Sequence, residues 1–279
     1  MGRHVYFADN LESPSYEEHL DGLTIHVPEI NGVGRYEVPA ETIVGELNPA
    51  FNIYSWKGPA HPTIIYHHGT MEEPFDFSAH AKNTFFHIFG NDRKNIDANL
   101  IVIRAPFHTG TPKEFARKMR RLSNLVAMLT VSVKLIEHLA AFSKHDRNIP
   151  VLVAGISLGG FVANLHRAFY NTADIYVPML AGAALESLFL DSRYRTMTGK
   201  NALANPDVLA AALNFEDRFE RVADNNVFPL LARYDRLILY ERQARCYGDL
   251  PVRVLDRGHV TAALSTDILR DHIVNRLKK

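Results

Sequence analysis

Apolar runs alternate with amphipathic stretches from residue 63 to the end of the chain. The runs in which nearly every position is apolar are typical of buried parallel strands. We expect these strands at 63–67, 100–104, 151–154, 175–184, 227–232 and 252–255. Apolar positions spaced by three and four residues predict the intervening helices. We expect these helices at 78–89, 113–143, 161–170, 240–246 and 261–277. This alternation predicts the α/β class, with a mostly parallel central sheet flanked by helices on both faces.

The first 60 residues and the segment 186–226 depart from this alternation. The first 60 residues are rich in turns, with candidate antiparallel strands at 24–27, 42–47 and 51–56. They either only start the sheet or also cover a pocket. The segment 186–226 predicts short helices at 187–190, 206–213 and 215–222. We therefore expect a single domain spanning 1–279, with 186–226 inserted as a small helical cap.

Composition narrows the class of protein. Lys+Arg and Asp+Glu both number 31, so the formal charge is zero, which argues against nucleic acid or an anionic membrane as the main partner. The single cysteine, Cys246, rules out a disulfide within the chain. We identify no signal peptide and no apolar run long enough to cross a membrane. These features predict a cytoplasmic protein.

Residues 155–159 read Gly-Ile-Ser-Leu-Gly and lie between a predicted strand and a predicted helix. Glycines on both sides of Ser157 remove Cβ atoms that would clash in a sharp turn. Such a turn lifts the serine hydroxyl out of the sheet, next to the free N–H groups of the helix. An ordinary glycine-rich turn is the alternative, and residues elsewhere in the chain are needed to distinguish the two interpretations.

A nucleophilic serine needs a base, and the base needs an acid that orients it. His259 lies in the first loop after the last predicted strand, and Asp235 follows the strand before it. Because the carboxyl ends of parallel strands form sites, we expect Ser157, Asp235 and His259 to converge. Asp235 could instead be a solvated turn residue, which would leave Glu186 or Asp191 as the acid.

The turn at Ser157 and the chain order Ser157, Asp235, His259 resemble the α/β-hydrolase superfamily. His68-Gly69, after the strand 63–67, is similar to the oxyanion loop of that superfamily.

The resemblance implies that the backbone N–H groups of Leu158 and Thr70 form an oxyanion hole, with Met71 as the neighbouring candidate.

Other histidines near the predicted site have alternative interpretations. The pair His67-His68 could suggest a metal site, but adjacent strand residues point to opposite faces, so we expect no metal and no cofactor. We expect His108 to be structural or to line the pocket. On the cap, Phe189, Tyr194, Met197 and Phe215 either line an acyl pocket or pack the cap onto the core.

The resemblance implies a serine hydrolase of carboxylesterase type, which cleaves a small-molecule acyl substrate through an acyl-enzyme on Ser157. An acyltransferase or thioesterase would use the same three residues. A catalytically inactive binding protein of the same fold is the remaining alternative. The physiological substrate and the oligomeric state stay open at this point.

Overall fold

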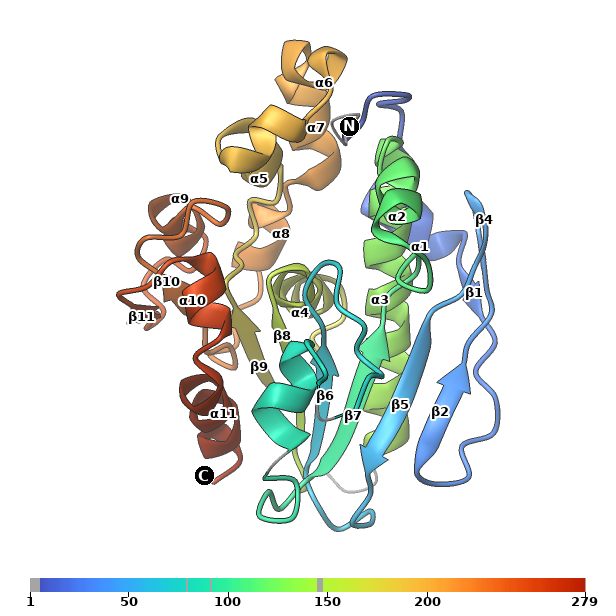
Figure 1. Ribbon diagram of the computed structural model, residues 1–279, viewed down its shortest axis with the longest axis vertical. Helices are drawn as coiled ribbons and strands as arrows, with labels where there is room; N and C mark the ends of the chain where they lie inside the picture. The colour runs from blue at the N-terminus through green and yellow to red at the C-terminus, as the bar shows by residue number, and fades with distance from the viewer. Residues whose placement is uncertain (1–5, 79, 91, 145–147, 279) are drawn as a thin grey trace.

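The computed structural model describes residues 6–78, 80–90, 92–144 and 148–278. Its centre is an eight-stranded sheet in the order β11-β10-β9-β8-β6-β7-β5-β2 (Figure 1). The strands are β2 (Gly34–Glu37), β5 (Ala50–Ser55), β6 (Thr63–His67), β7 (Asn99–Arg104), β8 (Val151–Ile156), β9 (Ile175–Met179), β10 (Leu230–Ala232) and β11 (Arg253–Leu255). The six strands from β6 to β11 pair in parallel, whereas β5 runs antiparallel to both β7 and β2. The predicted mostly parallel α/β sheet is confirmed.

Helices cover both faces of the sheet because successive buried residues of its strands point to opposite sides. Ile65 packs with α3 (Leu122–Ser143) and α4 (Leu158–Phe169) on one face. Ile64 packs on the other face with η1 (Phe86–Gly90) and α11 (Thr266–Val274).

The helix α3 is long and apolar enough to cross a membrane, contrary to our expectation that no segment of the chain would be. It packs against the sheet instead, and 72% of its most apolar stretch is buried. The helix α3 is therefore a core helix in this structure.

The expected helix 113–143 is two helices, α2 (Pro112–Lys118) and α3. Between them, the carbonyls of Met119 and Arg120 accept hydrogen bonds from the backbone N–H groups of Phe7 and Asp9. These carbonyls bond to a segment that is distant in sequence, so the periodicity of apolar residues in 113–143 cannot reveal the break in the helix.

Two other predicted helices are also shorter than expected. Residue 79 of the helix expected at 78–89 lies outside the described residues, and the described ones form only η1 and the residues just before it. The reason is that Asn83 donates to the carbonyls of Glu73 and Asp76 and accepts the backbone N–H of Phe86. The expected helix 261–277 is divided into α10 (His259–Ala263), α11 and η3 (Asn275–Leu277).

The first 60 residues form more than an edge of the central sheet. The expected strand 42–47 is a hairpin of β3 (Ala40–Thr42) and β4 (Gly45–Leu47), which turns at Gly45 with φ 103°. Together with β1 (Thr24–Ile25) this hairpin makes a separate three-stranded sheet. The strand β2 was not predicted, and α1 (Tyr16–Asp21) lies before β1.

The segment between β9 and β10 contains short helices that lie beyond the carboxyl ends of the strands (Figure 1). They are α5 (Glu186–Leu190), η2 (Arg193–Met197), α6 (Lys200–Ala204), α7 (Pro206–Leu213) and α8 (Glu216–Glu220). We call these helices the cap. After β10, α9 (Tyr240–Arg245) precedes the last strand.

We expect Gly159→Ala to lower the free energy of unfolding by more than about 3 kcal/mol. A Cβ at Gly159 would lie 2.1 Å from the backbone oxygen of His67, which belongs to a central strand and cannot move aside. Urea denaturation measures the change. Gly258→Ala is the control, since the nearest atom its Cβ would meet is Tyr234 O at 3.5 Å, an ordinary contact distance. Equal stability of both variants would contradict this account of the turn.

Candidate active site

Ser157 occupies a strained turn that connects β8 directly to α4. Its backbone adopts φ 53° and ψ −113°, an unusual conformation for a residue other than glycine. The turn is held at both ends, since Ser157 N donates to Met179 O (2.9 Å) and Phe161 N donates to Ser157 O (3.1 Å). The helix begins at Leu158, three residues earlier than predicted, so its free N–H groups start immediately after the serine.

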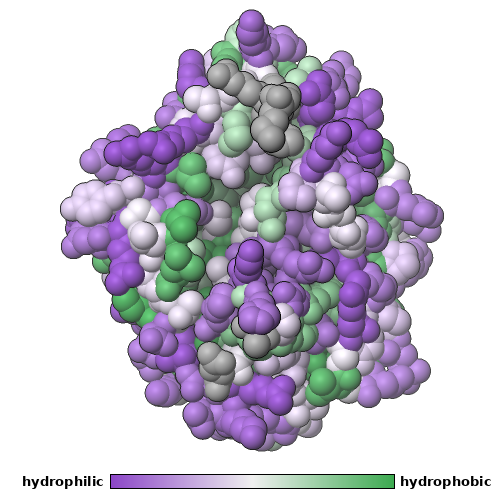
Figure 2. Space-filling view, viewed as in Figure 1, coloured by the Kyte–Doolittle hydropathy of each residue, from purple (hydrophilic) through white to green (hydrophobic). Residues whose placement is uncertain are grey.

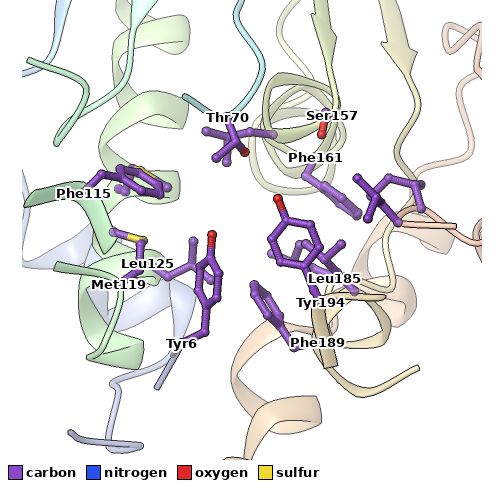
Figure 3. Close-up of a pocket in the computed structure, with 15 residues that line it drawn as sticks. Tyr6, Thr70, Phe115, Met119, Leu125, Ser157, Phe161, Leu185, Phe189 and Tyr194 are labelled. Atoms are coloured by element: carbon purple, nitrogen blue, oxygen red, sulfur yellow. The ribbon is translucent and has the colours of Figure 1, made fainter. Parts of the chain in front are cut away.

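Ser157, Leu158 and Thr70 line one apolar cavity of about 40 Å³ (Figure 3). The remaining lining side chains are aromatic or aliphatic, and those of the described residues include no charged group. On the surface, Figure 2 shows a hollow on this side of the molecule, between the cap and the sheet. The cavity therefore suits an uncharged, apolar group placed next to a serine hydroxyl.

Asp235 and His259 are joined by a hydrogen bond from His259 Nδ1 to Asp235 Oδ2 (2.6 Å). The other carboxylate oxygen, Oδ1, accepts the backbone N–H groups of Leu237 (2.8 Å) and Ile238 (2.9 Å). The Asp235 side chain is only 1% exposed, so this pairing fixes both the carboxylate and the imidazole tautomer. Leu237 and Ile238 also line the Ser157 cavity, which links the Asp235 turn to the serine.

The structure thus brings Asp235 and His259 into contact. No hydrogen bond between Ser157 and His259 is present in the described part of the chain. Such bonds commonly form only when substrate is bound. The alternative acid Glu186 is engaged elsewhere, with Arg242 (3.1 Å) and Asn214 (3.0 Å).

The loop after β6 places its two candidate donors differently. Thr70 lines the cavity of Ser157. Met71 is 44% exposed, has φ 68° and lines a neighbouring hollow together with His108 and Phe115. Thr70 is therefore better placed than Met71 to face a group bound at Ser157.

The side chain of His68 holds the loop after β6 in place through two hydrogen bonds. Its Nε2 accepts the backbone N–H of Ala105 (3.0 Å), so its proton lies on Nδ1 and is donated to Gly69 O (2.6 Å). Burial lowers the pKa of His68 well below its usual value, so the ring stays neutral. A neutral imidazole therefore connects the loop after β6 with the loop after β7.

The expected opposite orientation of His67 and His68 is wrong, because His68 lies beyond the end of β6. Their rings stack at 5.0 Å, and the Nδ1 atom of each faces a backbone carbonyl. His108 packs edge-on against His68 at 4.6 Å. No group of three or more His, Cys, Asp or Glu residues that could hold a metal ion occurs among the residues that the structure describes.

Glu72 is a half-buried carboxylate that no sequence motif marks. It accepts hydrogen bonds from the backbone N–H (2.9 Å) and hydroxyl (2.9 Å) of Thr84, and it also bonds the backbone of Gly69. Burial raises the pKa of Glu72, because these hydrogen bonds offset only part of the cost of desolvation. Nothing in the sequence pattern distinguishes Glu72 from its exposed neighbour Glu73.

The cap side chains divide between the cavity and the core. Phe189 and Tyr194 line the cavity, whereas Phe215 is buried in the core and Met197 is not part of the cavity wall. Tyr6, which no motif marks, also lines the cavity.

We expect the free energy of unfolding to fall as the pH is lowered from 6.5 to 4. Burial lowers the pKa of His67 to about 4, whereas an unfolded chain takes up that proton near 6.5. Between these values the unfolded state binds more protons, so acid favours unfolding. His67→Gln should reduce the slope by up to about 1.4 kcal/mol per pH unit. Denaturation at a series of pH values measures it, and the exposed His26→Gln serves as control. Identical slopes for His67→Gln and wild type would contradict this explanation.

Comparison with known proteins identifies the fold. Similar solved structures include acetyl xylan esterase 1 from Thermoanaerobacterium sp. JW/SL YS485 (TM-score 0.57, 12% identity, covering 96% of each chain). Est1E from Butyrivibrio proteoclasticus is also similar (TM-score 0.52, 13% identity, covering 91% of this chain and 99% of that one). An acylaminoacyl peptidase from Pyrococcus horikoshii matches at TM-score 0.58 and 12% identity, over 92% of this chain and 41% of the peptidase.

No curated protein matches the sequence significantly. The family described as alpha/beta hydrolase domain containing 18 matches residues 92–232, about half of the chain. The matched region includes the Ser157 turn and ends with β10, just before Asp235. The chain has the α/β-hydrolase fold and belongs to the family alpha/beta hydrolase domain containing 18.

Proposed function

We propose that this protein is a serine hydrolase that cleaves a carboxylic ester through an acyl-enzyme on Ser157. The observation that carries the proposal is the Ser157 turn itself. Ser157, whose backbone has a positive φ, lies at the N-terminus of α4, beside an uncharged cavity that Thr70 and Leu158 also line. The hydrogen-bonded pair Asp235–His259 supports it, because these residues follow β10 and β11 at the same edge of the sheet.

In the acylation step, Ser157 Oγ attacks the ester carbonyl carbon while its proton passes to His259 Nε2. Asp235 holds His259 through Nδ1 and stabilises the imidazolium that forms. The negative charge on the carbonyl oxygen is stabilised by the backbone N–H groups of Leu158 and Thr70. The tetrahedral intermediate collapses when the C–O bond breaks, and His259 returns the proton to the leaving alcohol.

In the deacylation step, His259 takes a proton from water as the water oxygen attacks the acyl carbon. The second tetrahedral intermediate expels Ser157 Oγ, which regains a proton from His259, and a carboxylic acid leaves. The uncharged walls of the cavity favour an apolar acyl group. One of the structurally similar proteins, acetyl xylan esterase 1, is an esterase by name, which supports an ester as the substrate class.

Ser157→Ala should lower kcat/KM for p-nitrophenyl esters by at least about 10³-fold, because the variant lacks the hydroxyl that forms the acyl-enzyme. A fluorophosphonate should label the wild type with one equivalent and should not label the variant. The control is Ser78→Ala, which changes an exposed serine that does not line the cavity. Hydrolysis that persists in Ser157→Ala would refute the nucleophile. Labelling without ester hydrolysis would favour a thioesterase or an acyltransferase, and absence of both would favour a binding protein.

We also expect Glu72→Gln to lower kcat about 10- to 100-fold with little change in KM. An amide cannot accept all the hydrogen bonds that the carboxylate receives from Thr84 and Gly69, so the loop that carries Thr70 should shift. Steady-state kinetics separate the two constants. Glu73→Gln removes a neighbouring exposed carboxylate and should behave as wild type. A change confined to KM would contradict a positioning role for Glu72.

A further inference from the structure

Residues 6–10, which we call the strap, connect the cap to the core beside the cavity. On the cap side, Tyr6 N donates to Met197 O (2.6 Å), and Gly199 N donates to Tyr6 O (2.7 Å). On the core side, Phe7 N donates to Met119 O (3.1 Å). Hydrogen bonds to two separate parts of the chain therefore fix the backbone of the strap.

Phe7 anchors the strap. Its side chain is 1% exposed and packs edge-on against Phe189 at 4.7 Å. Its backbone lies in the left-handed region (φ 59°), which is rare for an aromatic residue. This conformation lets Phe7 enter the core while Tyr6, its neighbour, turns toward the cavity (Figure 3).

Tyr6, Phe189 and Tyr194 form one aromatic wall of the cavity. The ring of Tyr6 lies 5.1 Å from that of Phe189 and 5.6 Å from that of Tyr194. Figure 3 shows this wall opposite Ser157 and Thr70, with the hydroxyl groups of both tyrosines directed toward them. Burial raises the pKa of both phenols, so they remain neutral.

The small space between this wall and Ser157 restricts what the cavity can hold. The cavity has a volume of about 40 Å³. One water molecule already requires roughly 10–15 Å³ of such space, so about three to four groups of that size, such as acyl carbons, fill the cavity. A longer acyl chain that extends straight away from Ser157 would meet the Tyr6 and Tyr194 rings on the opposite wall.

We propose that Tyr6 and Tyr194 are specificity-determining residues that limit the substrate to esters of short acyl chains. The inference rests on the proposed function, since it takes Ser157 as the point where the acyl group is attached. It adds that the strap, far from Ser157 in the sequence, supplies part of the acyl site.

The test compares kcat/KM for p-nitrophenyl acetate, butyrate, octanoate and dodecanoate. Wild type should favour acetate or butyrate over octanoate by at least about tenfold. Tyr194→Ala and Tyr6→Ala should each raise the octanoate-to-butyrate ratio by about tenfold or more, because each removes a ring from the wall. Tyr194→Phe and Tyr6→Phe keep the rings and should keep the wild-type ratio. Tyr194→Leu and Tyr6→Leu replace any alanine variant that fails to fold, with the same expected direction.

Fluorophosphonate labelling of each variant reports separately whether the nucleophile is intact. A ratio that stays at the wild-type value in folded, labelled alanine or leucine variants would overturn the inference and leave the proposed hydrolase function standing. A wild-type preference for octanoate or dodecanoate would also overturn it. A wild type that hydrolyses no ester and takes up no fluorophosphonate would refute the proposed function itself, and this inference with it.

Discussion

The candidate site depends on one backbone contact, between the first turn of α4 and the end of β6. A Cβ at Gly159 would lie 2.1 Å from His67 O, and one at Gly155 would lie 2.3 Å from Gly159 O. Only glycine allows so close an approach. The register of the sheet supports this contact, because His67 pairs with Gly155 and both strands end at nearly the same level. As a result, Leu158 and Thr70 lie on the same cavity although 88 positions separate them in the chain.

The loop after β6 must also be rigid if its N–H groups are to face a developing charge. Two side chains hold it, the buried His68 and the half-buried Glu72, and neither forms an ion pair with another described residue. His68 is neutral and uses its two nitrogens as donor and acceptor between Gly69 and Ala105. Glu72 receives hydrogen bonds from the Thr84 backbone and hydroxyl. Hydrogen bonds to fixed backbone groups specify one geometry more strictly than a mobile ion pair does, which suits preorganised electrostatic stabilisation.

The sequence predicts those parts of the fold whose determinants are local. The apolar runs at β6, β7 and β8 identify buried strands because both faces of a central parallel strand are covered. Three side chains could be selected as the candidate site because chemistry collects at the carboxyl ends of such strands. The pairing of Asp235 with His259 agrees with that selection. The catalytic roles themselves remain proposals.

What the sequence does not reveal depends on contacts between distant residues. The break between α2 and α3 requires the N–H groups of Phe7 and Asp9, more than a hundred positions away. The stacking of His67 on His68 depends on where β6 ends, since alternation applies only within a strand. No sequence motif predicts that Tyr6 lines the cavity, because its position in the cavity wall depends on where the strap is bound.

The cap is attached to the rest of the molecule from two directions, which bears on how the cavity is shaped. At one side Arg242 of α9 forms ion pairs with Glu186 of α5 and Glu216 of α8. Arg242 lowers the pKa of Glu216 to about 2, and Asn214 bonds both carboxylates. Breaking such a partly buried network would leave carboxylates without partners, which is strongly unfavourable.

At the other side the strap bonds the cap through Met197 and Gly199 while Phe7 is buried in the core. A cap that moved as a free lid would have to break both attachments together. The aromatic wall formed by Tyr6, Phe189 and Tyr194 is therefore part of the packed structure. The shape of the cavity follows from side-chain volume at fixed positions, so exchanging one ring changes that shape without requiring a change in the fold.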